Sequence, residues 1–254
     1  SPIVVQGSVY IGTADKHLHA LDAATGQPRW TAVVKDWIVS AAAYADGRVI
    51  VASQHSSLHV LDAATGQQRL AYDTGLGRHI GGGVAIQGER AYFGTFAGRV
   101  WAIDWRATAY RWDPMLLFWK TNLFLWGMLS TPPVQKGSVW SRAVGGDVPH
   151  TPAVAHGMLY VTTSKKLLLA LDSVTGKTQW STDLGVAPST APTVAGTTVL
   201  VGTKDGRVFG VQALTGEVLW TFKMEDKISA SPIVVDDTMY VVSVDGTLAA
   251  VTGE

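Results

Sequence analysis

The feature that most constrains the fold is a short motif that returns about every forty residues. The stretch "HALDAATGQPRW", from His19 to Trp30, is followed by "HVLDAATGQQRL", from His59 to Leu70. Six copies are recognisable, and successive copies are separated by 40, 42, 68, 40 and 40 residues. Self-similarity at such a period is typical of a repeat architecture, in which each unit buries its apolar surface against its neighbours. The sequence therefore predicts about six repeated units.

Each copy has the pattern of four short strands. In the first copy these are "SPIVV", "SVYIGTA", "HLHALD" and "QPRWTAVV", separated by Gln-Gly, Asp-Lys and Thr-Gly turn signals. Alternation of β-branched and aromatic residues with small or polar ones favours strands over helices. Four antiparallel strands in about forty residues form the blade of a β-propeller. The predicted fold is all-β, a β-propeller of about six four-stranded blades. A β-solenoid is the alternative, although it needs shorter coils.

The whole chain, residues 1–254, is predicted to be a single propeller domain. Glu254 comes before the fourth strand of the sixth copy, so the last blade is expected to be incomplete. Either the protein has more chain, with seven or eight blades as alternatives, or a partner supplies a strand to the open edge. Because Ser1 lies inside a repeat, we expect a processed or partial chain. The predicted blades are 1–40, 41–81, 82–112, 149–190, 191–230 and 231–254, with an insertion at 113–148.

The recurring motif has an evident structural role. Asp22 is expected to accept hydrogen bonds from backbone amides two or three residues later, and Gly26 to supply the positive φ of a tight reversal. A tryptophan four residues after this glycine buries a large area and can reach the next blade. Since tryptophan recurs at equivalent places, we expect blade docking rather than ligand stacking. The predicted docking residues are Trp30, Trp112, Trp180 and Trp220.

The pattern Ala-x-Asp-x-x-Thr-Gly-x-x-x-Trp, with "SPIVV" and "VYIGT" upstream, resembles the tryptophan-docking repeat of the pyrroloquinoline quinone (PQQ)-like propeller superfamily. The resemblance covers nearly the whole chain outside residues 113–148. It implies an exported protein, periplasmic or otherwise extracytoplasmic. The superfamily includes quinoprotein dehydrogenases and a BamB-like non-catalytic branch.

The resemblance to the enzymes is incomplete. Quinoprotein dehydrogenases carry a vicinal cysteine pair beside the quinone and a carboxylate-lined calcium site. This chain has no cysteine, and no Glu/Asn/Asp set can be assigned to one ion. The resemblance is therefore to the BamB-like non-catalytic branch, and no cofactor is expected. A PQQ-dependent dehydrogenase remains the enzyme alternative.

Charge and residue spacing exclude other functions. Lysine plus arginine equals aspartate plus glutamate at 20 each, so there is no basic field to bind a nucleic acid. No Ser/His/Asp set can be defined. His17 and His19 lie two residues apart on a predicted strand, an arrangement that could suggest a metal. However, His19 shares its place in the repeat with residues of several kinds, so we expect a position for any bulky side chain and no metal site. Those residues are His59, Trp101, Leu169 and Phe209.

The loops fall into two groups. In an antiparallel meander, the second-to-third turns and the links between blades lie at one end, and the remaining turns lie at the other. The first end, called here the loop face, has the more varied polar residues. Loops on a rigid scaffold commonly carry binding groups, although solvated loops would carry the same charges. Its candidate binding residues are Lys35, Asp36, Trp37, Arg78, His79, Lys223, Glu225 and Lys227.

The insertion contains "DPMLLFWKTNLFLWGMLSTPPV", from Asp113 to Val134. Asp113, as the cap, and Pro114 predict a helix start, and Pro132 and Pro133 block its continuation, so a helix over about 114–129 is expected. It is apolar around most of its circumference and must be buried against something. Its length of about 24 Å is short for crossing a bilayer.

Three partners for this helix are open: the propeller's own channel, the lipid headgroup zone with Trp119 and Trp126 as anchors, and another subunit. An exposed apolar patch of this size marks an interaction site. The candidate docking residues, for a membrane protein or a membrane surface, are Leu116, Leu117, Phe118, Trp119, Leu123, Phe124, Leu125 and Trp126.

These observations predict a non-catalytic protein-binding scaffold, an accessory subunit of a membrane-associated complex. Its partner would be a protein, part of a membrane complex, bound through the loop face and the insertion, with contact to the membrane surface as a further expectation. The extracytoplasmic sensor domain of a larger receptor is a second alternative to this reading.

Overall fold

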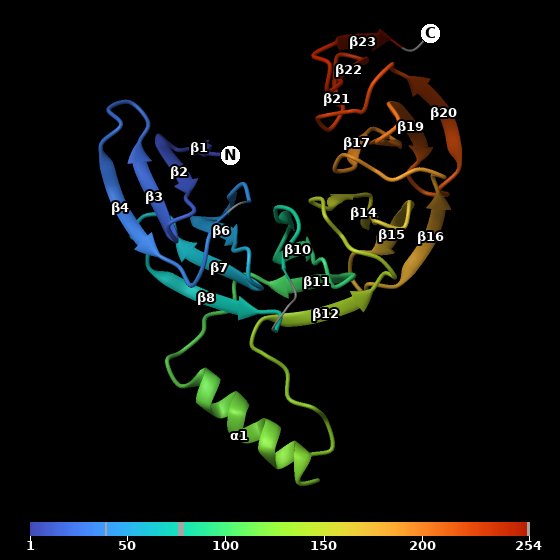
Figure 1. The fold of residues 1–254 in the computed structure, drawn as a ribbon. Coiled ribbons are helices and arrows are strands. Elements are labelled where there is room, and N and C mark those ends of the chain that lie inside the picture. The colour runs from blue at the N-terminus through green and yellow to red at the C-terminus, as the bar shows by residue number, and fades with distance from the viewer. Residues whose placement is uncertain (39, 76–78, 253–254) are drawn as a thin grey trace. The chain divides into compact units, whose positions relative to one another are not determined.

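The computed structural model describes residues 1–38, 40–75 and 79–252. These residues form 23 strands and one helix, arranged in five four-stranded sheets and one three-stranded sheet (Figure 1). Every strand pairing with a defined register is antiparallel, and strands follow one another across each sheet in chain order. The all-β fold of blade-like sheets is therefore confirmed.

The first sheet contains β1 (Ile3–Val5), β2 (Ser8–Gly12), β3 (His17–Asp22) and β4 (Pro28–Val33). The second contains β5 (Ala43–Ala45), β6 (Arg48–Ala52), β7 (Ser57–Asp62) and β8 (Gln68–Asp73). The third contains β9 (Ala85–Gln87), β10 (Arg90–Gly94), β11 (Arg99–Asp104) and β12 (Ser138–Ala143).

The fourth sheet contains β13 (Ala153–Ala155), β14 (Met158–Thr162), β15 (Leu167–Asp172) and β16 (Thr178–Asp183). The fifth contains β17 (Thr193–Ala195), β18 (Thr198–Gly202), β19 (Arg207–Gln212) and β20 (Val218–Lys223). The sixth contains β21 (Ile233–Val235), β22 (Thr238–Val242) and β23 (Leu248–Thr252). The helix, α1, is Asp113–Leu125.

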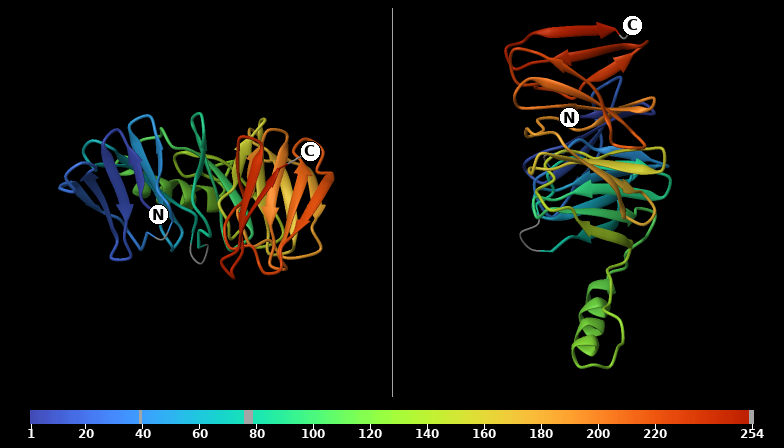
Figure 2. Two further views of the ribbon diagram at one scale, coloured as in Figure 1. Left: turned by 90° about the horizontal axis from the view of Figure 1, so that it is seen from above. Right: turned by 90° about the vertical axis from the view of Figure 1, so that its right-hand side faces the viewer.

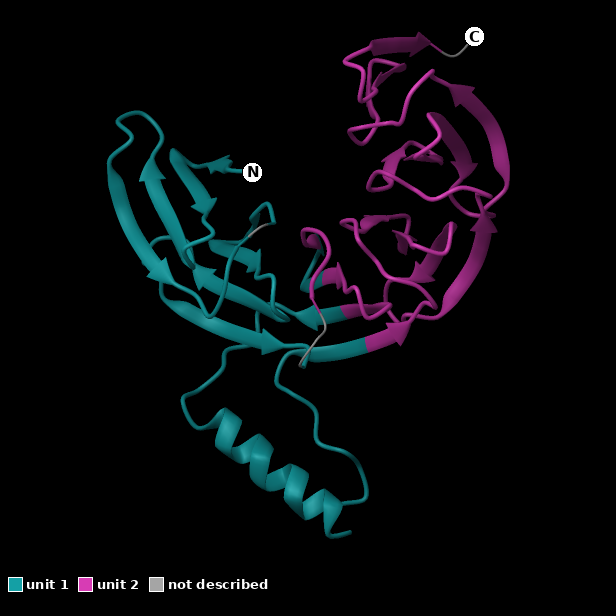
Figure 3. Ribbon diagram, in the orientation of Figure 1, with its two compact units in different colours: residues 1–78, 86–91, 102–140 teal, residues 79–85, 92–101, 141–254 magenta. Residues whose placement is uncertain are grey.

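The chain divides into two compact units (Figure 3). Unit 1 comprises residues 1–78, 86–91 and 102–140, with the first two sheets and α1. Unit 2 comprises residues 79–85, 92–101 and 141–254, with the last three sheets. The third sheet contributes residues to both. Within unit 2 the small sheets form successive layers (Figure 2).

The core of each unit lies between neighbouring sheets. In unit 1, Leu18 of β3 and Val49 and Val51 of β6 belong to one buried cluster. In unit 2, Leu168 of β15 and Val201 of β18 occupy the corresponding positions. The central two strands of each sheet supply most of these residues. In β6 and β14 both faces of the strand are buried, whereas β2 and β22 alternate between buried and partly exposed residues. Each sheet is therefore stabilised by packing against the sheet that precedes or follows it in the chain.

The Asp-x-x-Thr-Gly turn has the predicted geometry. The Oδ1 atom of Asp22 accepts hydrogen bonds from the amides of Ala24 and Thr25 at 3.0 and 2.9 Å, and Gly26 has a φ of 71°. An Arg29 side chain binds the other carboxylate oxygen at 2.6 Å. This Arg29 contact, followed by the Thr25 hydrogen bonds, holds the pKa of Asp22 well below its ordinary value of 3.8. The turn between the third and fourth strands is therefore fixed by local hydrogen bonds.

The position of the insertion differs from the expectation. Residues 82–112 were predicted to complete the third blade, but its fourth strand is β12, which lies after α1. The extra residues therefore separate the third and fourth strands of one sheet, between Asp104 and Ser138, instead of separating two blades. The physical reason is that the turn of this blade has lost its Thr-Gly pair and is replaced by the whole inserted segment.

The helix is also shorter than predicted. It ends at Leu125 rather than at about residue 129. Gly127, with a φ of 75°, donates to the carbonyl of Phe124, and the Met128 amide donates to the carbonyl of Leu123. This pair of bonds is a Schellman motif, which closes a helix with a left-handed glycine before any proline is reached. No helix among the described residues is long and apolar enough to cross a membrane.

Candidate functional site

Two of the four predicted docking tryptophans lie between neighbouring sheets. The Nε1–H group of Trp30 donates to the Ala63 carbonyl of the second sheet at 2.9 Å, and that of Trp180 donates to the Ala213 carbonyl of the fifth sheet at 2.9 Å. Each ring covers the glycine of the next Thr-Gly turn. A Cβ atom on Gly66 would lie 2.7 Å from the Trp30 ring. These tryptophans thus join consecutive sheets by contacts with backbone.

The other two tryptophans lie differently. Trp220 packs against Gly210 of its own sheet and is 41% exposed. Trp112 lies outside the sheets, immediately before α1, and is 59% exposed. Its prediction as a docking residue was wrong, because Trp140 takes the third place in β12 that Trp30 takes in β4. Trp140 also precedes the next first strand by thirteen residues, as Trp30 does.

Within unit 1, the predicted loop-face residues form a connected polar cluster. The Lys35 ammonium lies 2.8 Å from the Asp73 carboxylate. The Asp36 carboxylate contacts the ring of His55, which lies in the turn between β6 and β7. Partial burial opposes ionisation of Asp36, but the amide of Trp37 and the His55 ring outweigh it and lower the carboxyl pKa below 3.8. The Trp37 indole packs edge-on against His55 and remains half exposed. Sequence reasoning missed His55, whose only signal was its place in a second-to-third turn.

The remaining loop-face candidates belong to unit 2 or are not described. Arg78 lies outside the described residues. Lys223 is the last residue of β20, and its ammonium binds the Asp205 carbonyl. Glu225 and Lys227 lie on the link that follows the fifth sheet. His79 lies on the link before the third sheet.

One hydrogen bond recurs along these links. A backbone carbonyl in the segment that links two sheets accepts a hydrogen bond from a backbone amide of the following sheet. That amide lies in the turn between the second and third strands. The hydrogen bond joins Trp37 to Gln54 at 2.9 Å, His79 to Phe96 at 2.8 Å, and Lys227 to Val244 at 2.9 Å. The links and the second-to-third turns therefore meet at one end of each sheet, as the meander geometry predicts.

The insertion is anchored to unit 1 at its base. The Ala109 amide donates to the Arg69 carbonyl of β8 at 2.8 Å, and the Gln135 side chain donates to the Ala71 carbonyl at 3.1 Å. The Lys136 ammonium lies 3.6 Å from the Asp113 carboxylate and 4.3 Å from the Tyr110 ring. Both connecting segments are thus held by the outer strand of the second sheet.

Asp113 does not cap the helix in the predicted way. The cap residue is Trp112, which makes no side-chain cap hydrogen bond. The Asp113 carboxylate instead accepts from the Tyr110 amide at 2.7 Å, while the Asp113 amide donates to the Tyr110 carbonyl at 3.0 Å. This closed turn directs the carboxylate away from the first helical amides.

Beyond its base, α1 projects from the sheets of unit 1 (Figure 1), and none of its residues is buried. Of the eight predicted docking residues, Leu117, Leu123 and Phe124 are partly covered. The other five are exposed, namely Leu116, Phe118, Trp119, Leu125 and Trp126. Tyr110 and Trp112 extend this apolar surface, with their rings stacked at 6.0 Å. The structure thus brings the predicted residues together on one exposed element.

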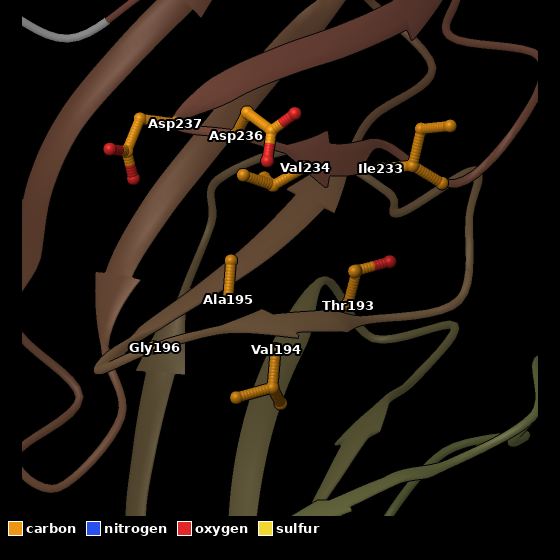
Figure 4. A pocket seen from close by; sticks show the side chains of 8 residues that line it. All are labelled: Thr193, Val194, Ala195, Gly196, Ile233, Val234, Asp236 and Asp237. Carbon is orange, nitrogen blue, oxygen red and sulfur yellow. The ribbon is translucent and has the colours of Figure 1, made fainter.

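Unit 2 contains a concave site between the first strands of two sheets (Figure 4). It has a volume of about 460 Å³ and is lined by residues of β17 and β21 and by the turn that carries Asp236 and Asp237. In the parts of the chain that are described, no three His, Asp or Glu side chains are placed to hold a metal ion.

Comparison with known proteins identifies the repeat. The family described as "Outer membrane protein assembly factor BamB" matches residues 2–122, 132–221 and 186–254. No curated protein sequence matches the chain.

Two solved structures show the same fold. A crystal structure of BamB from Moraxella catarrhalis is 22% identical, with a TM-score of 0.73, and the match covers 99% of this chain and 76% of that one. The computationally designed Ika8 protein is 16% identical, with a TM-score of 0.72, and the match covers 98% of this chain and 69% of that one. At these identities the likeness concerns the fold alone. The family match over almost the full length decides membership: the chain belongs to the BamB family of PQQ-like β-propeller proteins.

Proposed function

We propose that this protein is a non-catalytic scaffold, an accessory subunit of a membrane-associated complex that assembles outer-membrane proteins. The observation that carries the proposal is the match to the outer-membrane assembly factor family along almost the whole chain. Its location would be periplasmic and membrane-associated, and its partner a membrane protein complex. It would need no cofactor.

The loop face supports a protein partner. In unit 1, Lys35, Asp36 and Trp37 present a cation, an anion and a half-exposed indole within three residues. Tryptophan at the centre of a polar ring is typical of an interface hot spot. The Trp37 carbonyl accepts from the Gln54 amide, and the Trp37 amide donates to the Asp36 carboxylate. These bonds hold the backbone of this segment in place, so little conformational entropy is lost when a partner binds.

The experiment is purification from native membranes. The protein is washed on the membranes with high salt and then carbonate, extracted in mild detergent, and its co-purifying proteins are identified and quantified by mass spectrometry. We expect stoichiometric recovery with an integral membrane complex. Trp37→Ala should weaken binding about thirtyfold and lower recovery accordingly, because a hot-spot truncation costs roughly 2 kcal/mol.

The matched control is Val174→Ala, an exposed residue in a Thr-Gly turn at the other end of its sheet. It should leave recovery unchanged. Release as a free protein, or equal loss for both variants, would overturn the proposal. Reduction of a dye that depended on added PQQ would establish the enzyme alternative in its place.

A further inference from the structure

We propose that α1 inserts into one leaflet of a phospholipid membrane with anionic headgroups, so that lipid acyl chains, and not a protein groove, cover its apolar surface. This inference deepens the proposed function and rests on it only in placing the protein beside a membrane.

Six large apolar side chains of the helix and its C-cap are exposed, namely Met115, Leu116, Phe118, Trp119, Leu125 and Trp126. At 100° per residue they extend over about half of the helix circumference. A helix that docks in a protein groove buries a narrower stripe and keeps a polar face for water. Fluid acyl chains can cover such a broad surface, which favours lipid as the occupant.

The polar side chains within the helix are compatible with apolar surroundings. The Thr121 hydroxyl donates to the Leu117 carbonyl at 2.8 Å, and the Asn122 amide donates to the Phe118 carbonyl at 2.9 Å. Each of these side chains therefore donates a hydrogen bond to a backbone carbonyl of the helix itself. This bond lowers the free-energy cost of moving the side chain out of water.

The charges and aromatic rings suit a headgroup zone. Arg111 and Lys120 are exposed cations, while the Asp113 carboxylate faces Lys136 at 3.6 Å. The flexible stem of Lys120 can carry its ammonium to the surface while the helix lies below it. Exposed rings at both ends, Tyr110 and Trp112 before the helix and Trp126 after it, have the amphipathic character that concentrates at membrane interfaces. Together these groups predict a preference for anionic lipid.

The length of α1 agrees with insertion into a single leaflet. Its 13 residues span about 20 Å, against roughly 30 Å for the hydrocarbon core of a bilayer. Both connecting segments return to β8, so the helix enters and leaves on the same side.

The test uses the purified chain and vesicles alone. Because the protein has no cysteine, one introduced cysteine carries an NBD fluorophore at a single site. Variants Phe118→Cys and Leu125→Cys place the probe on one side of the helix, and Leu116→Cys places it on the opposite side. Val33→Cys is the control, since Val33 and Leu125 are 71% and 72% exposed. The vesicles contain phosphatidylethanolamine and phosphatidylglycerol at three to one.

We expect a severalfold rise and a blue shift of NBD emission at all three helix positions and no change at Val33. Leu125→Glu, in a parallel vesicle-flotation assay, should lower binding at least about tenfold, because burial of a leucine is worth about 1.5 kcal/mol or more. Vesicles of phosphatidylcholine alone should bind more weakly.

Unchanged emission at the helix positions, or a change on one side only, would overturn the inference. Neither result would affect the loop-face partner, which is absent from this assay. Conversely, vesicle binding by a protein that captures no membrane complex would uphold lipid insertion and remove the proposed scaffold function.

Discussion

At the scale of single residues, the joints between sheets are made by an indole and a glycine. The Trp30 N–H binds a carbonyl of the neighbouring turn, and its ring lies flat over Gly66, where no side chain stands in the way. The glycine therefore has two roles, since its φ of 72° also suits the turn. Gly26 has the same motif position and a φ of 71°, but open space beside it.

Alanine substitutions of Gly66 and Gly26 separate the backbone role of Gly66 from its contact with Trp30. Gly66→Ala should destabilise the protein more than Gly26→Ala, because both variants meet the backbone cost of about 1–2 kcal/mol but only Gly66→Ala displaces the Trp30 ring. Chemical unfolding followed by circular dichroism measures the difference. Trp30→Ala should remove it, so that both alanines then cost the same. Equal losses of unfolding free energy for Gly66→Ala and Gly26→Ala in the wild-type background would show that the Trp30 ring does not require this glycine.

A buried histidine makes stability depend on pH. His59 is 1% exposed, and burial lowers its pKa below 6.5 despite a hydrogen bond of 2.9 Å to Gln68, with Lys35 lowering it further and Asp73 raising it. The unfolded chain therefore binds the proton more readily than the folded one. The stabilisation is complete above pH 6.5 and is lost as the pH falls below that value.

We expect the Tm to fall between pH 7.5 and 5.0, and to fall less for His59→Phe, since other repeats carry a bulky apolar residue at this position. His150, whose pKa is also lowered by burial, should preserve part of the slope. Scanning calorimetry across this range provides the measurement. Identical slopes for the wild type and His59→Phe would refute the role of His59.

At the scale of elements, strands were predictable and the insertion only partly so. The alternating pattern and turn signals of each repeat located its strands, because these properties are local. The insertion could not be located in this way, because its place depends on the strand "SVWSRA". This strand pairs with β11 across the inserted residues, which is a long-range contact. The spacing from Trp140 to the next blade was the available signal. The helix end depended on Gly127, which is a stronger stop than the later prolines.

The helix is an independent element of unit 1. Because none of its residues is buried, replacing residues 111–133 with a short Gly/Ser linker should leave the free energy of unfolding within about 0.5 kcal/mol of the wild type. The anchors Ala109 and Gln135 remain in this variant. Urea unfolding tests the expectation, and a loss well above that size would mean that α1 contributes to the sheet core.

At the scale of the whole molecule, stability is distributed along the chain. Each buried cluster joins a sheet to its neighbour in sequence, as in proteins whose repeats contact only adjacent repeats. A defect in one sheet is therefore expected to weaken that sheet and its neighbours first.

Leu18 and Leu168 offer matched probes, since both are fully buried at the second place of a third strand. Each leucine-to-alanine change should cost about 2–5 kcal/mol. Native-state hydrogen exchange should increase first in β1–β4 for Leu18→Ala and in β13–β16 for Leu168→Ala. The same exchange pattern for both variants would show that the protein unfolds as one unit.

The contact between Trp30 and the Ala63 carbonyl has an evolutionary consequence. An indole that binds a main-chain carbonyl makes no demand on the side chain of the residue that carries it, and Trp180 makes the same contact with Ala213. The only side-chain requirement on the next repeat is the glycine that its Thr-Gly turn already has. A duplicated repeat would therefore fit beside any repeat that keeps this glycine, without a compensating substitution. A gene for such a protein can lengthen or shorten by whole copies, while each copy diverges freely in its loops.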